Sequence, residues 1–71
     1  MERISGTIIE IQRRWDRQAD HSPVYVLDAE GREEIAVDYS QRRLDLQVGE
    51  PATFIGRRAA SGELSIHAYE R

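Results

Sequence analysis

Two clusters of arginine, one of which includes the only tryptophan, carry the side chains of this chain that are best suited to binding chemistry. Residues 13–17 read RRWDR, and residues 57–58 are a second pair of arginines. A guanidinium group can form two parallel hydrogen bonds with a phosphate or a carboxylate, and an indole ring offers a flat surface on which a base can stack. The candidates for contact with single-stranded DNA or RNA are Arg13, Arg14, Trp15, Arg17, Arg57 and Arg58.

Each of these residues also has a structural interpretation. Tryptophan is well buried on average, so Trp15 could pack on the rim of the fold instead of facing a ligand. Charged pairs such as Arg57 and Arg58 are common at the solvated ends of strands. All ten basic residues are arginine, and a coding bias would produce this pattern without selection for phosphate contacts. Both interpretations stay open at the level of sequence.

The charge is distributed unevenly along the chain, which has a net charge of −3. Residues 1–22 have four arginines and four acids, residues 23–39 one arginine and five acids, and residues 40–71 five arginines and four acids, giving 0, −4 and +1. An acidic central segment repels a phosphate backbone and suits a basic protein partner. Nucleic-acid contact is therefore expected only at the arginine clusters.

Five segments have the β-branched composition or the alternation of apolar and polar residues that is typical of strands. They are residues 4–11, 23–28, 32–39, 52–58 and 63–69. Residues 29–31, which read AEG, predict a hairpin turn, because Gly31 can adopt the positive φ that a short turn needs. Residues 40–49 fit neither period and are expected to form a connection with at most one helical turn.

Pairing across this turn predicts two faces for the central hairpin. The core face would carry Tyr25, Leu27, Ile35, Val37 and Tyr39. The opposite face would carry two valines and an alanine edged by acids, a composition typical of a protein-interaction surface. The residues of this alternative site are Val24, Val26, Asp28, Glu34, Ala36 and Asp38. Its acidic rim would suit a basic protein partner.

The five segments predict an all-β fold in which a small five-stranded sheet closes into a Greek-key barrel over residues 1–71, as a single domain. Closing the sheet buries one face and leaves no exposed edge. The first segment has Ile4 and Ile8 on one face and Ile9 and Ile11 on the other. Either both faces are covered, or the strand switches faces through a kink, which Gly6 would tolerate, and takes part in both halves of the sheet.

The stretches YVLDAEGREEIAVDY (25–39) and VGEPATFIGRRAASGELSIHAY (48–69) resemble the second–third and fourth–fifth hairpins of the OB-fold family of five-stranded barrels. An SH3-like barrel is the alternative, because the chain lacks a clear helix between the third and fourth strands. The resemblance implies a ligand surface on the outer face of the second and third strands, flanked by the loops that hold the arginine clusters. These loops would converge at one end, where Trp15 would offer a stacking platform.

The sequence offers little for catalysis, and we expect a non-enzymatic protein without a cofactor or a metal. It contains no cysteine, which excludes disulfides and thiolate metal sites. His21 lies near Asp16 and Asp20 in a spacing that matches no metal motif, and His67 is expected on the surface of the last strand. No glycine-rich phosphate loop is present, and so small a barrel is expected to have no room for a substrate pocket of typical size.

The first residues, MERISGTIIEI, carry a charge within three positions and have no apolar stretch of the length that a signal peptide or a membrane span needs. Nothing in them indicates targeting or anchoring. We therefore expect a cytoplasmic protein without a membrane partner.

Replacing Trp15 separates its two interpretations. If bases stack on the indole, Trp15→Ala should remove about 1–3 kcal/mol of oligonucleotide-binding free energy and leave the fold intact. Oligonucleotide titration and thermal unfolding of the same variant provide the two measurements. If the variant unfolds more easily and the parent binds no oligonucleotide, Trp15 belongs to the core.

Overall fold

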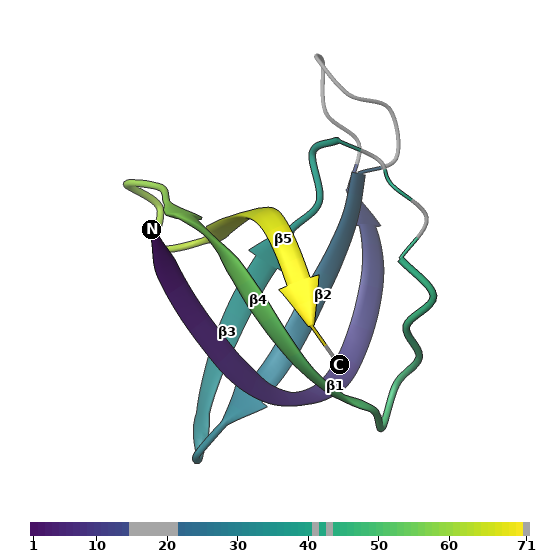
Figure 1. The fold of residues 1–71 in the computed structure, drawn as a ribbon. Coiled ribbons are helices and arrows are strands. Elements are labelled where there is room, and N and C mark those ends of the chain that lie inside the picture. The colour runs from purple at the N-terminus through teal and green to yellow at the C-terminus, as the bar shows by residue number, and fades with distance from the viewer. Residues whose placement is uncertain (15–21, 41, 43, 71) are drawn as a thin grey trace.

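Five strands close into a small barrel in the computed structural model, which describes residues 1–14, 22–40, 42 and 44–70 (Figure 1). The strands are β1 (Glu2–Arg14), β2 (Ser22–Ala29), β3 (Arg32–Val37), β4 (Pro51–Arg58) and β5 (Leu64–Glu70). No described residue is helical, so the predicted all-β class is confirmed, and the described residues of the connection between β3 and β4 form no helical turn. The expected segments match these strands closely, except that β1 extends to Arg14 and β3 ends two residues earlier.

The first strand belongs to both halves of the sheet. Its first half pairs with β4, from Glu2 opposite Gly56 to Thr7 opposite Pro51, and its second half pairs with β2, from Thr7 opposite Asp28 to Arg14 opposite Ser22. The register shifts between Ile8 and Glu10, which marks a β-bulge. The strand therefore changes partner at Thr7, which is the second of the two alternatives that its apolar residues left open.

The strands follow the order β1-β2-β3-β5-β4, and β4 pairs with β1 to close the barrel. All neighbours are antiparallel except β3 and β5, which run parallel through two residue pairs, Ala36–Leu64 and Val37–Ser65. This closed five-stranded barrel is compatible with an OB-like or an SH3-like fold.

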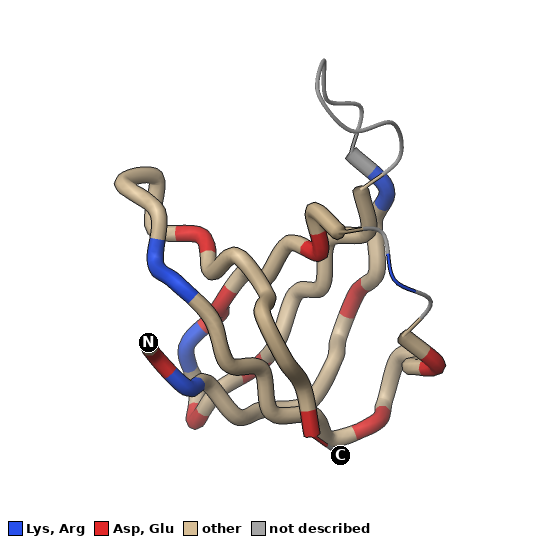
Figure 2. The backbone as a smooth tube through the Cα atoms, turned by 45° about the horizontal axis from the view of Figure 1, so that its top comes forward, with Lys and Arg blue, Asp and Glu red and all other residues tan. Residues whose placement is uncertain are grey.

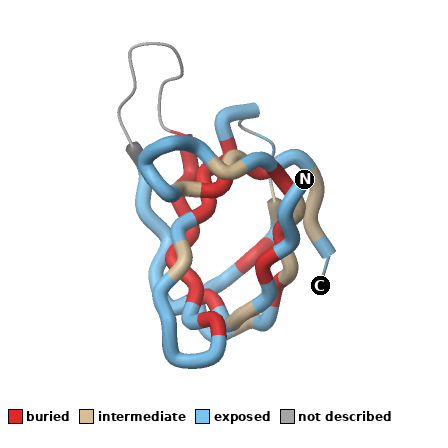
Figure 3. The backbone as a smooth tube through the Cα atoms, turned by 90° about the vertical axis from the view of Figure 1, so that its left-hand side faces the viewer, coloured by how far each residue is buried: buried red, intermediate tan, exposed pale blue. Residues whose placement is uncertain are grey.

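The core lies inside the barrel and takes residues from every strand (Figure 3). The buried cluster is Ile4, Ile8, Tyr25, Leu27, Ala36, Leu46, Ala52, Phe54, Leu64 and Ile66. The rings of Tyr25 and Phe54 pack with their centroids 5.3 Å apart. Leu44 and Leu46 come from the connection between β3 and β4, so this segment covers the core without forming regular structure.

The predicted faces of the central hairpin were wrong in its second strand. The turn has two residues instead of three, because Glu30 and Gly31 both adopt positive φ, at 55° and 84°, and Ala29 pairs with Arg32. Two positive φ values are typical of the tight turns whose twist matches the flanking strands. A turn shorter by one residue moves every side chain of β3 to the other face.

The resulting register places Ala36 opposite Tyr25, and Glu34 opposite Leu27, on the core side. Ile35 and Tyr39, which were expected in the core, are 36% and 42% exposed. Val37 is buried, but it pairs with Val24 on the face opposite to Tyr25 and lies outside the core cluster.

Gly6 is required where β1 passes from one half of the sheet to the other. A Cβ at this position would lie 2.5 Å from the carbonyl oxygen of Asp28 and 2.9 Å from its carbonyl carbon, both backbone atoms of the neighbouring strand. We expect Gly6→Ala to lower the free energy of unfolding by about 2–3 kcal/mol, because strand pairing must be displaced to make room. Urea unfolding measures this loss.

Gly31→Ala is the matched control for this substitution. No heavy atom of the described part of the chain beyond its two neighbours in sequence lies within 4 Å of a Cβ at Gly31, so the variant has only the cost of a positive φ, about 1 kcal/mol. Equal losses in the two variants would contradict the close approach of β1 and β2 at Gly6.

Candidate nucleic-acid interface

Arg58 lies at the end of β4 and is held by carboxylates from two other strands. Its Nε and Nη2 donate to Oε2 of Glu2, at 3.0 and 2.7 Å, and its Nη1 donates to Oε1 of Glu34 at 2.9 Å. Nη1 also donates to the carbonyl oxygen of Gly62 at 2.8 Å. Arg58 therefore ties β4 to β1, to β3 and to the turn before β5, and its charge is balanced within the protein.

The ion pairs shift the pKa values of their members in the expected directions. Hydrogen bonding to Arg58 lowers the pKa of the Glu2 carboxyl, and bonding to Glu2 and then to Glu34 raises the pKa of Arg58. Glu34 has only 17% of its side chain exposed, whereas Glu2 has 51%. The network thus covers the core side of the barrel at this end instead of offering a cation to a ligand.

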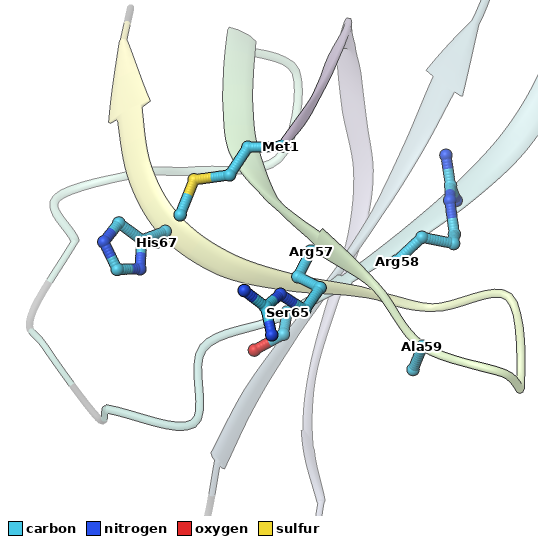
Figure 4. A pocket seen from close by; sticks show the side chains of 6 residues that line it. All are labelled: Met1, Arg57, Arg58, Ala59, Ser65 and His67. Carbon is cyan, nitrogen blue, oxygen red and sulfur yellow. The ribbon is translucent and has the colours of Figure 1, made fainter.

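Arg57 faces the opposite way from Arg58, because successive side chains of a strand alternate between its two sides. Arg58 pairs with Leu64, a core residue, whereas Arg57 pairs with Ser65 on the outside of the barrel. Figure 4 shows the Arg58 side chain turned away from Arg57 and Ser65. Arg57 is exposed and has no ion-pair partner in the described part of the chain.

A hollow of about 380 Å³ lies beside Arg57 on the outer side of β4 and β5. It is lined by Met1, Arg57, Arg58, Ala59, Ser65 and His67, none of which is acidic (Figure 4). The expectation that so small a barrel has no room for a pocket was therefore wrong for its outer surface, because this volume lies within the range of ligand sites. Ser65 was not among the predicted contacts, and His67 was expected on the surface, where it is exposed.

The other predicted contacts are only partly described. Arg13 is exposed near the end of β1, and Arg14 is the last residue of that strand. Trp15 and Arg17 lie outside the described residues, as do Asp16, Asp20 and His21. The end of β1 and the end of β4 lie on opposite sides of the barrel (Figure 1), and acidic segments lie between the basic ones (Figure 2). The described backbone of the two clusters therefore lies apart in these views.

The alternative protein-binding residues do not share one exposed face. Val24, Val26, Ala36 and Asp38 are buried. The side chain of Glu34 binds Arg58, and Asp28 accepts a hydrogen bond from the Gly31 amide at 3.0 Å, next to the hairpin turn. The two-residue turn is again the reason, since it divides the predicted set between the two sides of the sheet. The patch of two valines and an alanine edged by acids is absent from the described surface of β2 and β3.

Asp38 is fully buried beside the connection that follows β3. Its Oδ1 accepts a hydrogen bond from Ser40 at 2.7 Å and lies 3.8 Å from Nε of Arg42, whereas its Oδ2 has no hydrogen-bond partner among the described residues. Burial raises the pKa of the Tyr25 phenol, and the charge of Asp38 raises it further. Asp38 therefore holds the start of the connection between β3 and β4 through Ser40 and Arg42, and it does not lie on a ligand surface.

Among the described residues there is neither a cluster of metal-ligating side chains nor a helix that could span a membrane. No group of three histidine, cysteine or acidic side chains among them could hold a metal ion. No helix in that part of the chain is long and apolar enough to cross a membrane.

Comparison with known proteins adds no relative: no model of a protein family matches the chain, and searches of curated proteins and of solved structures found no match.

The Arg58 network should make stability depend on pH in a defined direction. The pKa of Glu2 is lowered from 4.5, so its contribution is present above that pH and is lost as the pH falls through the folded value. Arg58→Gln should therefore lower the unfolding midpoint at neutral pH, and its difference from the parent should shrink in more acidic solution. Thermal unfolding over a pH series tests this.

Arg57→Gln is the control, because it removes the same charge one residue earlier on the other side of the strand. Its unfolding midpoint should stay close to that of the parent at every pH. A difference for Arg58→Gln that does not change between neutral and acidic pH would contradict the role of the carboxylates.

Proposed function

We propose that this chain is a non-enzymatic binding module that makes weak, salt-sensitive contacts with single-stranded nucleic acid through the outer side of β4 and β5. The observation that carries the proposal is Arg57, an exposed guanidinium without a carboxylate partner in the described chain, beside a hollow that no acidic residue lines. Phosphate neutralisation by arginine supplies most of the affinity in sequence-independent nucleic-acid binding. Arg13 and the other members of the first cluster would add contacts at the end of β1.

The path proposed for the nucleic acid differs from the one that the resemblance implied. The outer side of the β2–β3 hairpin carries Asp28 directly opposite Glu33, and both are exposed. Two neighbouring carboxylates would repel a phosphate backbone. The nucleic-acid strand is therefore proposed to cross the outer side of β4 and β5, where Arg57 lies. Arg58 is not a contact in this proposal, because Glu2 and Glu34 already occupy its donors.

We also propose that the barrel is OB-like. The support is the strand order, in which β3 lies beside β5 and not beside β4. This step makes the chain a Greek key instead of a simple meander, and a Greek-key barrel of five strands is the OB arrangement. The other function that the sequence suggested is binding of a basic protein partner. It has less support, because the apolar residues predicted to form an exposed face on β2 and β3 are buried.

An amide NMR titration tests the proposed function. A single-stranded oligonucleotide of mixed sequence and about eight nucleotides should shift resonances of residues 56–63 and of β5 at low salt, and the shifts should fade toward about 150 mM salt. Arg57→Gln should weaken binding severalfold, since it removes one phosphate contact.

Arg32→Gln is the control for charge alone. Arg32 is exposed at the start of β3, and its Nη2 lies 4.0 Å from Oε2 of Glu34. This variant removes the same positive charge from another part of the surface and should bind like the parent. An unchanged spectrum of the parent at low salt, or equal weakening by both substitutions, would overturn the proposal.

A further inference from the structure

The hollow on β4 and β5 brings together three polar side chains that nothing else in the described chain uses. Arg57 and Ser65 are directly opposite each other, and His67 follows Ser65 on the same side of β5. No hydrogen bond or ion pair joins the Ser65 hydroxyl, the His67 ring or the Arg57 guanidinium to another described residue. Three donors thus face one space without partners.

A close approach of the two strands holds Arg57 against Ser65. The register between β4 and β5 shifts between Ile55 and Gly56, and a Cβ at Gly56 would overlap with the carbonyl oxygen of Ser65. Only glycine allows this spacing. The donors are therefore positioned by strand pairing, which is more rigid than a loop.

The charges around the hollow favour an anion. None of its six lining residues is acidic, and the charge of Arg58 is balanced by Glu2 and Glu34. Arg57 is therefore an uncompensated charge of the lining. A phosphate fits better than a carboxylate, because its three or four oxygens can accept two hydrogen bonds from the guanidinium and a third from the hydroxyl.

Met1 and Ala59 add an apolar part to the lining, and the hollow is of suitable size for a nucleoside. The Met1 side chain extends toward His67 in Figure 4, and Ala59 lies at the other end of the hollow. A thioether and an imidazole ring both pack well against the flat face of a base. A volume of about 380 Å³ accommodates a ligand of one nucleotide but not a longer segment.

We propose that this hollow is a mononucleotide subsite, in which Arg57 and Ser65 bind the phosphate and His67 with Met1 contacts the nucleoside. The inference deepens the proposed function and rests on it for the choice of nucleotides over other phosphate esters. The phosphate could belong to a free nucleotide or to a nucleic-acid strand, and the two sources are separable by competition.

The test is an NMR titration of the chain with AMP, with inorganic phosphate and with adenosine. AMP should shift the resonances of Arg57, Ser65 and His67, and it should bind several times more tightly than inorganic phosphate or adenosine, because each of these makes only half of the contacts. No shift at these residues with AMP, or AMP binding no tighter than phosphate, would overturn the proposal.

Ser65→Ala removes one hydroxyl from the subsite and should weaken AMP binding by about five- to tenfold. Ser61→Ala is the matched control, since Ser61 is exposed in the turn before β5 and does not line the hollow. Amide spectra of both variants establish that they fold. Equal affinities of the two variants for AMP would contradict the role of Ser65.

Competition then identifies the source of the phosphate and separates this inference from the proposed function. Displacement of AMP by an oligonucleotide without terminal phosphates assigns the subsite to a phosphate of the strand. AMP bound at the hollow of a chain that binds no oligonucleotide would support the subsite and overturn the proposed function. Oligonucleotide bound with no AMP shift at the hollow would do the reverse.

Discussion

The pairing of β1 with two partners is the constraint on which the rest of the structure depends. This sheet of five short strands closes because β1 serves both halves, and Thr7 is the residue that pairs in both directions, with Pro51 and with Asp28. The missing side chain at Gly6 lets the strands approach there, and the bulge at Ile9 shifts the register so that Ile11, and not Glu10, lies opposite Tyr25. The barrel interior, and hence which residues face outward, follows from this crossing.

Closure also explains why two adjacent arginines have different roles. On β4 the alternation of a strand sends Arg58 to the core side, where Glu2 and Glu34 from β1 and β3 meet it, and Arg57 to the outside, where it faces Ser65. Arg58 therefore stabilises the fold, and Arg57 remains available to a ligand. A count of basic residues cannot distinguish them, whereas the strand order does.

The sequence was sufficient for the class and the five strands, because these follow from composition and from the period of two, whereas it left the double role of β1 as one of two alternatives. It was insufficient for the faces of β3, since these depend on whether Ala29 belongs to the turn or to the strand, and one residue reverses every face. The partners of Arg58 could not be predicted either, because Glu2 and Glu34 lie 56 and 24 residues away in the chain. The sequence did carry one signal for the hollow. Ser65 and His67 alternate to the same side of the last strand, and the turn at residues 59–62 brings Arg57 opposite Ser65.

The salt dependence of oligonucleotide affinity, measured for the parent and for Arg57→Gln, tests the central claim most directly. Each phosphate contact that a single strand makes with a cation contributes a slope of about −0.7 to log K against log salt. If Arg57 binds a phosphate, the slope of the variant should be smaller in magnitude by about this amount. Identical slopes for the two proteins would show that Arg57 contacts no phosphate and would contradict the account.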